Sequence, residues 1–143
     1  MTCAKLGEAE VFAAAGIRDL LIANIVVGSL KLRRLVALRR IADPIVCVDH
    51  IEQVTALSQV LAREPEPLRV LIEVDIGMQR AGVQPGQPAL DLARQIADLP
   101  GLRLAGVMGY EGHLLLLTDP AEKEREVPHR THGQVPQREG ADE

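Results

Sequence analysis

Apolar runs alternate with amphipathic stretches over the first 110 residues of the chain. Four runs rich in leucine, isoleucine and valine begin near positions 19, 45, 69 and 102, and stretches with helical spacing of their apolar residues separate them. Strands that alternate with helices in this way are typical of βα units, whose strands run parallel in one sheet. The pattern therefore predicts an α/β fold.

The predicted strands cover residues 19–24, 45–49, 70–76 and 102–110, and the predicted helices cover residues 5–16, 29–42, 50–64 and 89–99. Residues 1–4 are expected to form a short extended segment. Each strand run ends in polar or glycine-rich sequence, which comprises Asn24, Asp49 with His50, residues 75–80 and residues 110–113. Because parallel strands point the same way, we expect these ends to meet at one edge of the sheet.

The third apolar run combines a buried strand pattern with charged side chains. Residues 70–76 predict a strand buried on both faces, yet the run carries Glu73 and Asp75 two positions apart and hence on one face. A buried carboxylate is costly unless it is paired or hydrogen-bonded. Two interpretations stay open: a ligand site at the strand's carboxyl end that includes Arg80, or a structural ion pair between Arg80 and one of the acids.

Composition excludes several classes of protein. The 143 residues are 47% hydrophobic and 25% charged, which suits a globular domain, and the net charge of -4 argues against a nucleic-acid partner. Phe12 and Tyr110 are the only aromatic residues, so the core must be aliphatic. No apolar run approaches membrane-spanning length. Cys3 and Cys47 lack metal-type spacing and predict two buried thiols in a reducing cytoplasm.

The predicted units are too few to close a barrel. A (β/α)8 barrel needs eight strands, so the four to five consecutive βα units expected here form only part of a TIM-type barrel, with the first unit upstream. After residue 127 the sequence becomes polar, and residues 128–143 predict a disordered tail. His129 and His132 in that tail are too weak a pattern to predict a metal site. We expect one partial barrel domain over residues 1–127.

The chain resembles the D-threonine aldolase and D-serine dehydratase-like family in the segments TCAKLGEAEVFAAAGIRDLLIAN, VLIEVDIGMQRAGVQPG and LAGVMGYEGH. The similarity runs from residue 2 to residue 127. The block from Asp75 to Gly82 also resembles alanine racemases, whereas GYEGH at residues 109–113 is typical of the aldolase and dehydratase branch. The resemblance implies a fragment of a pyridoxal-phosphate enzyme with an alanine-racemase-type barrel.

The resemblance also implies roles for individual residues. Arg80 matches the family arginine near the cofactor's 3-hydroxyl, where a guanidinium favours the phenolate form. Tyr110 matches the cofactor-site tyrosine, whose ring can pack on the pyridine. Glu73 and Asp75 are then expected to hold Arg80 in place.

Three further residues are expected at the rim of the site or behind it. These are Asn24, His50 and His113, and for His113 a local hydrogen bond within its loop is the competing interpretation. The resemblance implies a small D-amino acid with a β-hydroxyl as the substrate of the full-length family.

The family's catalytic lysine, which forms the Schiff base with the cofactor, lies on a strand that this chain lacks. Lys5 belongs to the following block, Lys31 lies on a helix face and Lys123 lies in an acidic run, so none of them is expected to replace it. The divalent-metal ligands of the full-length family are also absent. We therefore expect no catalytic residue in this chain and little or no activity from it alone.

Two other kinds of protein remain open. The first is a non-catalytic pyridoxal-phosphate carrier, and the second is a truncated scaffold fragment without chemistry. The sequence leaves aldolase against dehydratase activity open. An unclosed barrel exposes unpaired strand edges, so we also expect self-association or a homodimer.

Overall fold

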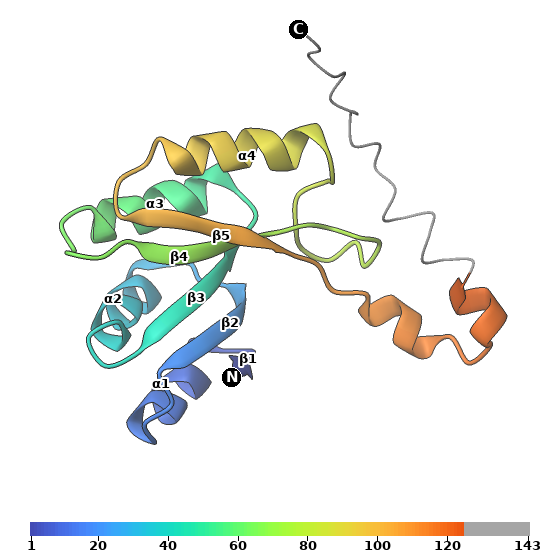
Figure 1. The fold of residues 1–143 in the computed structure, drawn as a ribbon, viewed down its shortest axis with the longest axis horizontal. Helices are drawn as coiled ribbons and strands as arrows, with labels where there is room; N and C mark the ends of the chain where they lie inside the picture. The colour runs from blue at the N-terminus through green and yellow to red at the C-terminus, as the bar shows by residue number, and fades with distance from the viewer. Residues whose placement is uncertain (125–143) are drawn as a thin grey trace, which may run out of the picture.

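The structure, a computed structural model, describes residues 1–124; the predicted tail over 128–143, with His129 and His132, lies outside the described residues. A five-stranded parallel sheet has the order β1-β2-β3-β4-β5, and four α-helices connect its strands (Figure 1). The elements are β1 (Thr2–Cys3), α1 (Leu6–Ala14), β2 (Asp19–Ile25), α2 (Ser29–Leu38), β3 (Asp43–Val48), α3 (Ile51–Leu61), β4 (Leu68–Glu73), α4 (Gln87–Ala97), β5 (Leu102–Met108) and the 3-10 helix η1 (Gly112–Leu116).

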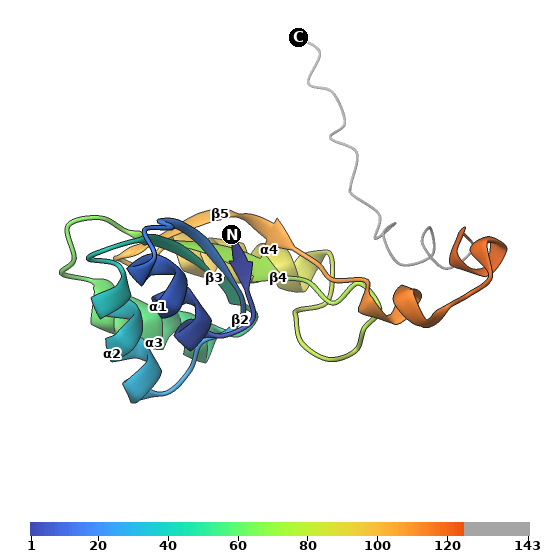
Figure 2. The ribbon, with the colours of Figure 1, turned by 90° about the horizontal axis from the view of Figure 1, so that it is seen from below.

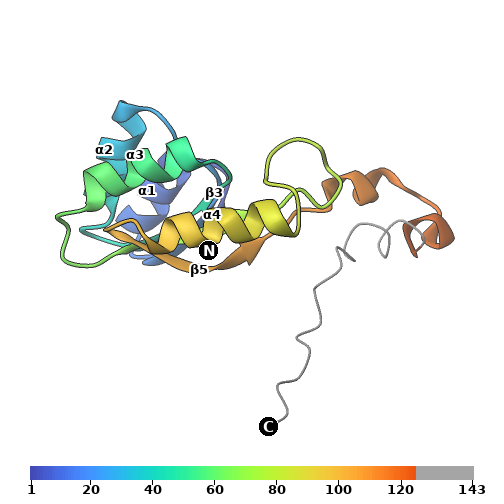
Figure 3. The same ribbon diagram turned by 90° about the horizontal axis from the view of Figure 1, so that it is seen from above.

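This architecture confirms the predicted α/β class and the parallel strands. The short extended segment over residues 1–4 contains a fifth strand, β1, which pairs with β2 through Thr2–Leu21 and Cys3–Ile22. Sequential parallel strands joined by right-handed crossovers place their helices on one face of the sheet. Figures 2 and 3 show this arrangement for α1 to α4, with the sheet curved around its other face.

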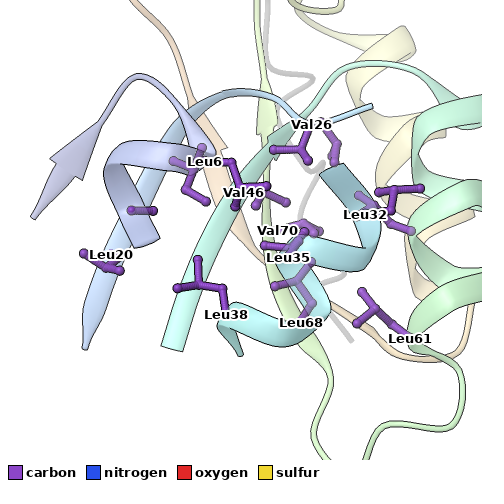
Figure 4. Packing of buried hydrophobic residues seen from close by; sticks show 14 of the residues in the cluster. Leu6, Leu20, Val26, Leu32, Leu35, Leu38, Val46, Leu61, Leu68 and Val70 are labelled. Carbon is purple, nitrogen blue, oxygen red and sulfur yellow. The ribbon is translucent and has the colours of Figure 1, made fainter. Parts of the chain in front are cut away.

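The hydrophobic core lies between the sheet and the helices. Successive strand residues point to opposite faces, and in β2 and the first part of β4 buried residues that face the helices alternate with half-buried ones. Figure 4 shows this core from close by. Its fully buried strand members are Leu20, Ile22, Val46, Val48, Leu68, Val70 and Ile72, and its helix members include Leu35, Leu57, Leu61 and Ile96. Aliphatic side chains therefore fill the core, as the composition requires.

The prediction that the third apolar run is buried on both faces is wrong. Within β4, Arg69 and Leu71 are only half-buried, because no helix among the described residues covers the concave face that they share. The strand also ends at Glu73 rather than at residue 76. Val74 forms only an isolated bridge with Val83, since the chain turns back on itself in the following loop.

The described residues bear on two predictions made from composition, one about membrane-spanning segments and one about the two cysteines. Within residues 1–124, no helix is long and apolar enough to cross a membrane. Cys3 and Cys47 are both buried free thiols, as expected. Burial, followed by the Glu73 carboxylate, raises the pKa of Cys47 to about 12, so this thiol is inert at neutral pH.

Candidate cofactor site at the carboxyl ends of the strands

Arg80 and Tyr110 come from consecutive strand ends and meet in space. The loop after β4 carries Arg80, and Tyr110 follows β5; both segments leave the sheet at the same end (Figure 1). The Arg80 Cζ atom lies 5.5 Å from the centroid of the Tyr110 ring, within the range of a cation–π contact. The predicted convergence of these strand ends is therefore present in the structure.

A cavity of about 480 Å³ opens beside this pair. Its lining residues lie at or near the two edges of the curved sheet, which β1 and β5 form. They are Thr2, Leu21, Ala23, Arg80, Met108, Gly109 and Tyr110. Tyr110 is 46% exposed and its ring is available to a ligand. A second, more polar cavity of about 700 Å³ lies under the loop after β4 and is also lined by Arg80.

Two glycines allow the Tyr110 segment to pack as it does. A Cβ atom at position 109 would lie 2.8 Å from Ile76 Cδ1, so Gly109 permits close contact with the loop after β4. A Cβ atom at position 112 would overlap the Tyr110 ring. Gly112 therefore leaves room for the Tyr110 ring, and Gly109 leaves room for Ile76 of the neighbouring loop.

Asp75 organises the loop that carries Arg80. Its Oδ1 atom accepts hydrogen bonds from the backbone N–H groups of Gly77 and Gln79, both at 2.9 Å. Its own N–H donates to the Val83 carbonyl at 2.8 Å. Since Asp75 lies beyond the end of β4, the expectation that it shares a strand face with Glu73 is wrong. These hydrogen bonds place it as the organiser of its own loop.

Glu73 is the buried carboxylate of the site. It is 5% exposed, and its Oε1 atom lies 4.0 Å from Arg80 Nη2, a long ion pair. Burial raises the pKa of Glu73, while the Arg80 charge opposes that rise and Asp49 adds to it. The ion pair between Arg80 and Glu73 is thus present, and it coexists with the contact between Arg80 and Tyr110.

Asn24 and His50 have structural partners away from the Tyr110 cavity. Asn24 donates from Nδ2 to the Ala4 carbonyl at 2.7 Å and accepts from Ile25 N–H at 2.8 Å, so it ties the loop after β1 to the end of β2. His50 caps α3, where its Nδ1 atom accepts from the Glu52 N–H at 3.3 Å. Neither residue lines the cavity beside Tyr110. The expectation that they lie at the rim of the site stays a prediction.

His113 differs from the expected loop histidine. It lies in η1, and both of its ring nitrogens are buried without a hydrogen-bond partner among the described residues. The local hydrogen bond considered for it is therefore absent from residues 1–124. Within the same residues, no group of three or more His, Cys, Asp or Glu side chains is placed to hold a metal ion.

Asp49 is a site residue that the sequence did not single out. Its Oδ2 atom accepts a hydrogen bond from the Gly82 N–H at 3.0 Å, and it lines the 700 Å³ cavity together with Arg80. The available signal was its position directly after the buried run 45–48. That signal predicts a polar strand end but does not predict its partner.

The three lysines lie outside the Arg80–Tyr110 cavity. Lys5 caps α1 through its backbone and lines a different cavity, of about 550 Å³, together with Lys31. Lys123 follows η1 near the end of the described residues. None of the three lines the cavity beside Tyr110. This placement agrees with the expectation that none of them replaces a catalytic lysine, which stays a prediction.

Arg80 and Tyr110 thus place a cation and an aromatic ring side by side at the carboxyl edge of a parallel βα sheet, which is where folds of this kind carry their ligand sites. The family model described as "Alanine racemase, N-terminal domain" matches residues 1–137. The chain therefore belongs to the alanine racemase N-terminal domain family.

Comparison with individual proteins shows which members of the family this chain resembles. The chain is 44% identical over 110 residues to a D-threonine aldolase of Arthrobacter sp., covering 77% of this chain and 29% of that protein. It is 33% identical over 133 residues to a D-threo-3-hydroxyaspartate dehydratase of Delftia sp., covering 87% and 35% respectively. The crystal structure of D-threonine aldolase from Filomicrobium marinum superposes with a TM-score of 0.83 at 42% identity, covering 87% of this chain and 34% of that chain. The chain thus spans about a third of the length of these relatives.

Proposed function

We propose that this chain is a fragment of a pyridoxal-phosphate-dependent lyase that acts on D-amino acids with a β-hydroxyl group. The observation that carries the proposal is the cation–π pair of Arg80 and Tyr110 beside a cavity at the carboxyl ends of the strands. The similarity to a D-threonine aldolase and to a D-threo-3-hydroxyaspartate dehydratase supports the substrate class and leaves both activities open.

The residues present fit the cofactor's chemistry. Pyridoxal phosphate carries a phenolic oxygen and a flat pyridine ring, so a guanidinium and an aromatic ring are suitable neighbours. Arg80 would bind the 3-oxygen, and Tyr110 would pack against the ring. Glu73 would restrain the Arg80 guanidinium from below, with Asp75 holding the backbone of the loop. When bound, the cofactor supplies a ring that withdraws electrons from the substrate's α-carbon.

We propose that the 143-residue chain alone has little or no turnover, because the family's catalytic lysine and divalent-metal ligands match no residue in it. On this proposal, its ligands are the cofactor and a small D-amino acid rather than nucleic acid or a membrane. A cytoplasmic location is predicted from the two free cysteines.

We also propose that the chain self-associates through its open sheet edges.

A titration of the chain with pyridoxal phosphate, followed by visible absorbance and by borohydride trapping, tests the proposal. Arg80→Met is expected to weaken binding about tenfold, the loss of one charge-assisted hydrogen bond. Arg94→Met is the matched control, since Arg94 is also an exposed arginine with a carboxylate partner but lies on α4. Equal affinities for the two variants would contradict the assignment of Arg80.

The same samples separate a cofactor-binding chain from a scaffold fragment and test whether the chain turns over substrate. Cofactor binding without turnover of D-threonine or D-serine is the expected result, and measurable turnover would refute the inactivity of the isolated chain. No binding at all would favour a scaffold fragment without chemistry. Borohydride trapping on Lys5 would overturn the view that this lysine is structural.

A further inference from the structure

Asp49 connects the end of β3 to the loop that carries Arg80. Its carboxylate accepts the hydrogen bond of the Gly82 N–H at 3.0 Å, across 33 residues of sequence. Arg80 is two residues before Gly82 and belongs to no helix or strand. The backbone position of Arg80 therefore depends on the contacts that hold this loop.

The loop is held tightly at the Gly82 end. Gly82 has φ +105°, and a Cβ atom there would lie 2.6 Å from the Asp75 nitrogen. The next residue, Val83, donates its N–H to the Glu73 carbonyl at 2.9 Å and accepts from the Asp75 N–H. The hydrogen bond of Asp49 ties this closed loop to β3, whereas the hydrogen bonds of Asp75 and Val83 hold it to β4 and to itself.

We propose that Asp49 is a positioning residue: by holding the Gly82 amide it fixes residues 79–82 so that the Arg80 guanidinium lies over the Tyr110 ring. Asp49 acts through Gly82, and a cofactor need not touch it. The consequence for cofactor affinity rests on the proposed function. The expected effect on the geometry of Arg80 and Tyr110 does not rest on the proposed function. An experiment can therefore contradict one of these two expectations and leave the other standing.

Tyr110 reports on this geometry without any cofactor. It is the single tyrosine of a chain that has no tryptophan, so tyrosine fluorescence and the tyrosine band of the near-ultraviolet circular dichroism arise from one ring, whereas Phe12 contributes only at shorter wavelengths. Asp49→Ala is expected to lose most of the near-ultraviolet signal while the far-ultraviolet spectrum stays unchanged. Asp49→Asn keeps an oxygen that can accept from Gly82 and is expected to retain the signal. Asp98→Ala, an exposed acid at the end of α4, is the control.

Pyridoxal phosphate titration supplies the second readout. The dissociation constant is expected to rise about tenfold in Asp49→Ala and to change less than about twofold in Asp49→Asn and Asp98→Ala. An unchanged tyrosine signal and an unchanged affinity in Asp49→Ala would overturn the positioning role. A wild-type chain that binds no cofactor but whose tyrosine signal depends on Asp49 would refute the proposed function and leave the positioning role standing.

A measurement on the wild-type chain covers the case in which Asp49→Ala does not fold. The Gly82 amide is expected to exchange its hydrogen at least about tenfold more slowly than the Gly86 amide, because Gly82 donates to a carboxylate, whereas Gly86 donates no hydrogen bond to any of residues 1–124. Exchange of Gly82 as fast as that of Gly86 would show that Asp49 does not hold the loop.

Discussion

Gly82 and Gly86 both have positive φ angles but different surroundings. Their φ angles are +105° and +87°, yet a Cβ atom at Gly82 would meet the Asp75 backbone at 2.6 Å, whereas nothing lies within 4 Å of one at Gly86. Comparing the two positions separates the cost of a left-handed backbone from the cost of a steric clash.

Gly82→Ala is expected to lower the free energy of unfolding by about 2–4 kcal/mol, because strain and overlap add. Gly86→Ala is expected to cost less, about 1–2 kcal/mol, because only the backbone strain of a positive φ applies there. Urea denaturation followed by far-ultraviolet circular dichroism measures both. Equal losses at the two positions would mean that the loop relaxes around the added methyl group.

Burial of Glu73 makes stability depend on pH. Since burial raises the pKa of Glu73 above its unfolded value, the folded state binds more protons between the two values, and stability falls as pH rises through that window. Glu73→Gln cannot ionise, so it is expected to gain stability relative to the wild type at neutral pH. The gain should vanish below the ordinary pKa of glutamate. Urea denaturation over a pH series tests this, and a difference that is independent of pH would contradict it.

The elements of the fold follow from local patterns, but their ends do not. Hydrophobic periodicity is a property of neighbouring residues, so it predicted β2 to β5 and α1 to α4 as types, whereas β1 was expected only as an extended segment and η1 was not predicted. The end of β4 depends instead on the pairing of Val74 with Val83 and on the hydrogen bonds of Asp75, which close the loop. The sequence contains no local signal for this closure, and it therefore placed residues 74–76 in the strand.

The same distinction applies to the site. Parallel topology alone predicted that the ends of β4 and β5 meet, which brings Arg80 to Tyr110. The contact between Asp49 and Gly82 joins residues 33 positions apart, and only the folded chain selects that partner. For Asn24 and His50, a polar residue after a strand was an ambiguous signal, since polar side chains also cap helices and tie loops.

Arg69 joins three strands at the amino end of the sheet. Its Nη2 atom lies 2.8 Å from Asp43 Oδ2 and 3.1 Å from Asp19 Oδ1, so β4 is linked to β3 and β2. Arg103 is its neighbour in register on β5 and forms no ion pair within residues 1–124.

Arg69→Met is expected to lower the free energy of unfolding by about 1 kcal/mol, a modest value because both aspartates are largely exposed. Arg103→Met is the matched control and is expected to change it by less than about 0.5 kcal/mol. Urea denaturation at low and high salt measures both, and the Arg69 effect should shrink with salt. An effect that salt does not change would indicate lost packing of the side chain instead.

At the scale of the whole molecule, the sheet is open. β5 is its outer strand within residues 1–124, and its outward-facing Val107 is 68% exposed. The Met108 carbonyl accepts from the N–H of Val74, the residue directly after β4, and peptide groups alternate in direction along a strand. The N–H and C=O groups of Val107 therefore point to the free edge, where another strand can pair with them.

This edge gives the proposed self-association a specific test. The wild-type chain is expected to sediment as a concentration-dependent mixture, and Val107→Lys is expected to raise the dissociation constant at least about tenfold, because a charge on an edge strand opposes pairing. Val11→Lys is the matched control, since Val11 is also 68% exposed but lies on α1, away from β5. A monomer at every concentration, or the same shift in both variants, would remove the edge of β5 from the explanation. A shift in Val107→Lys alone would locate the contact at that strand, since the two variants add the same charge to equally exposed valines.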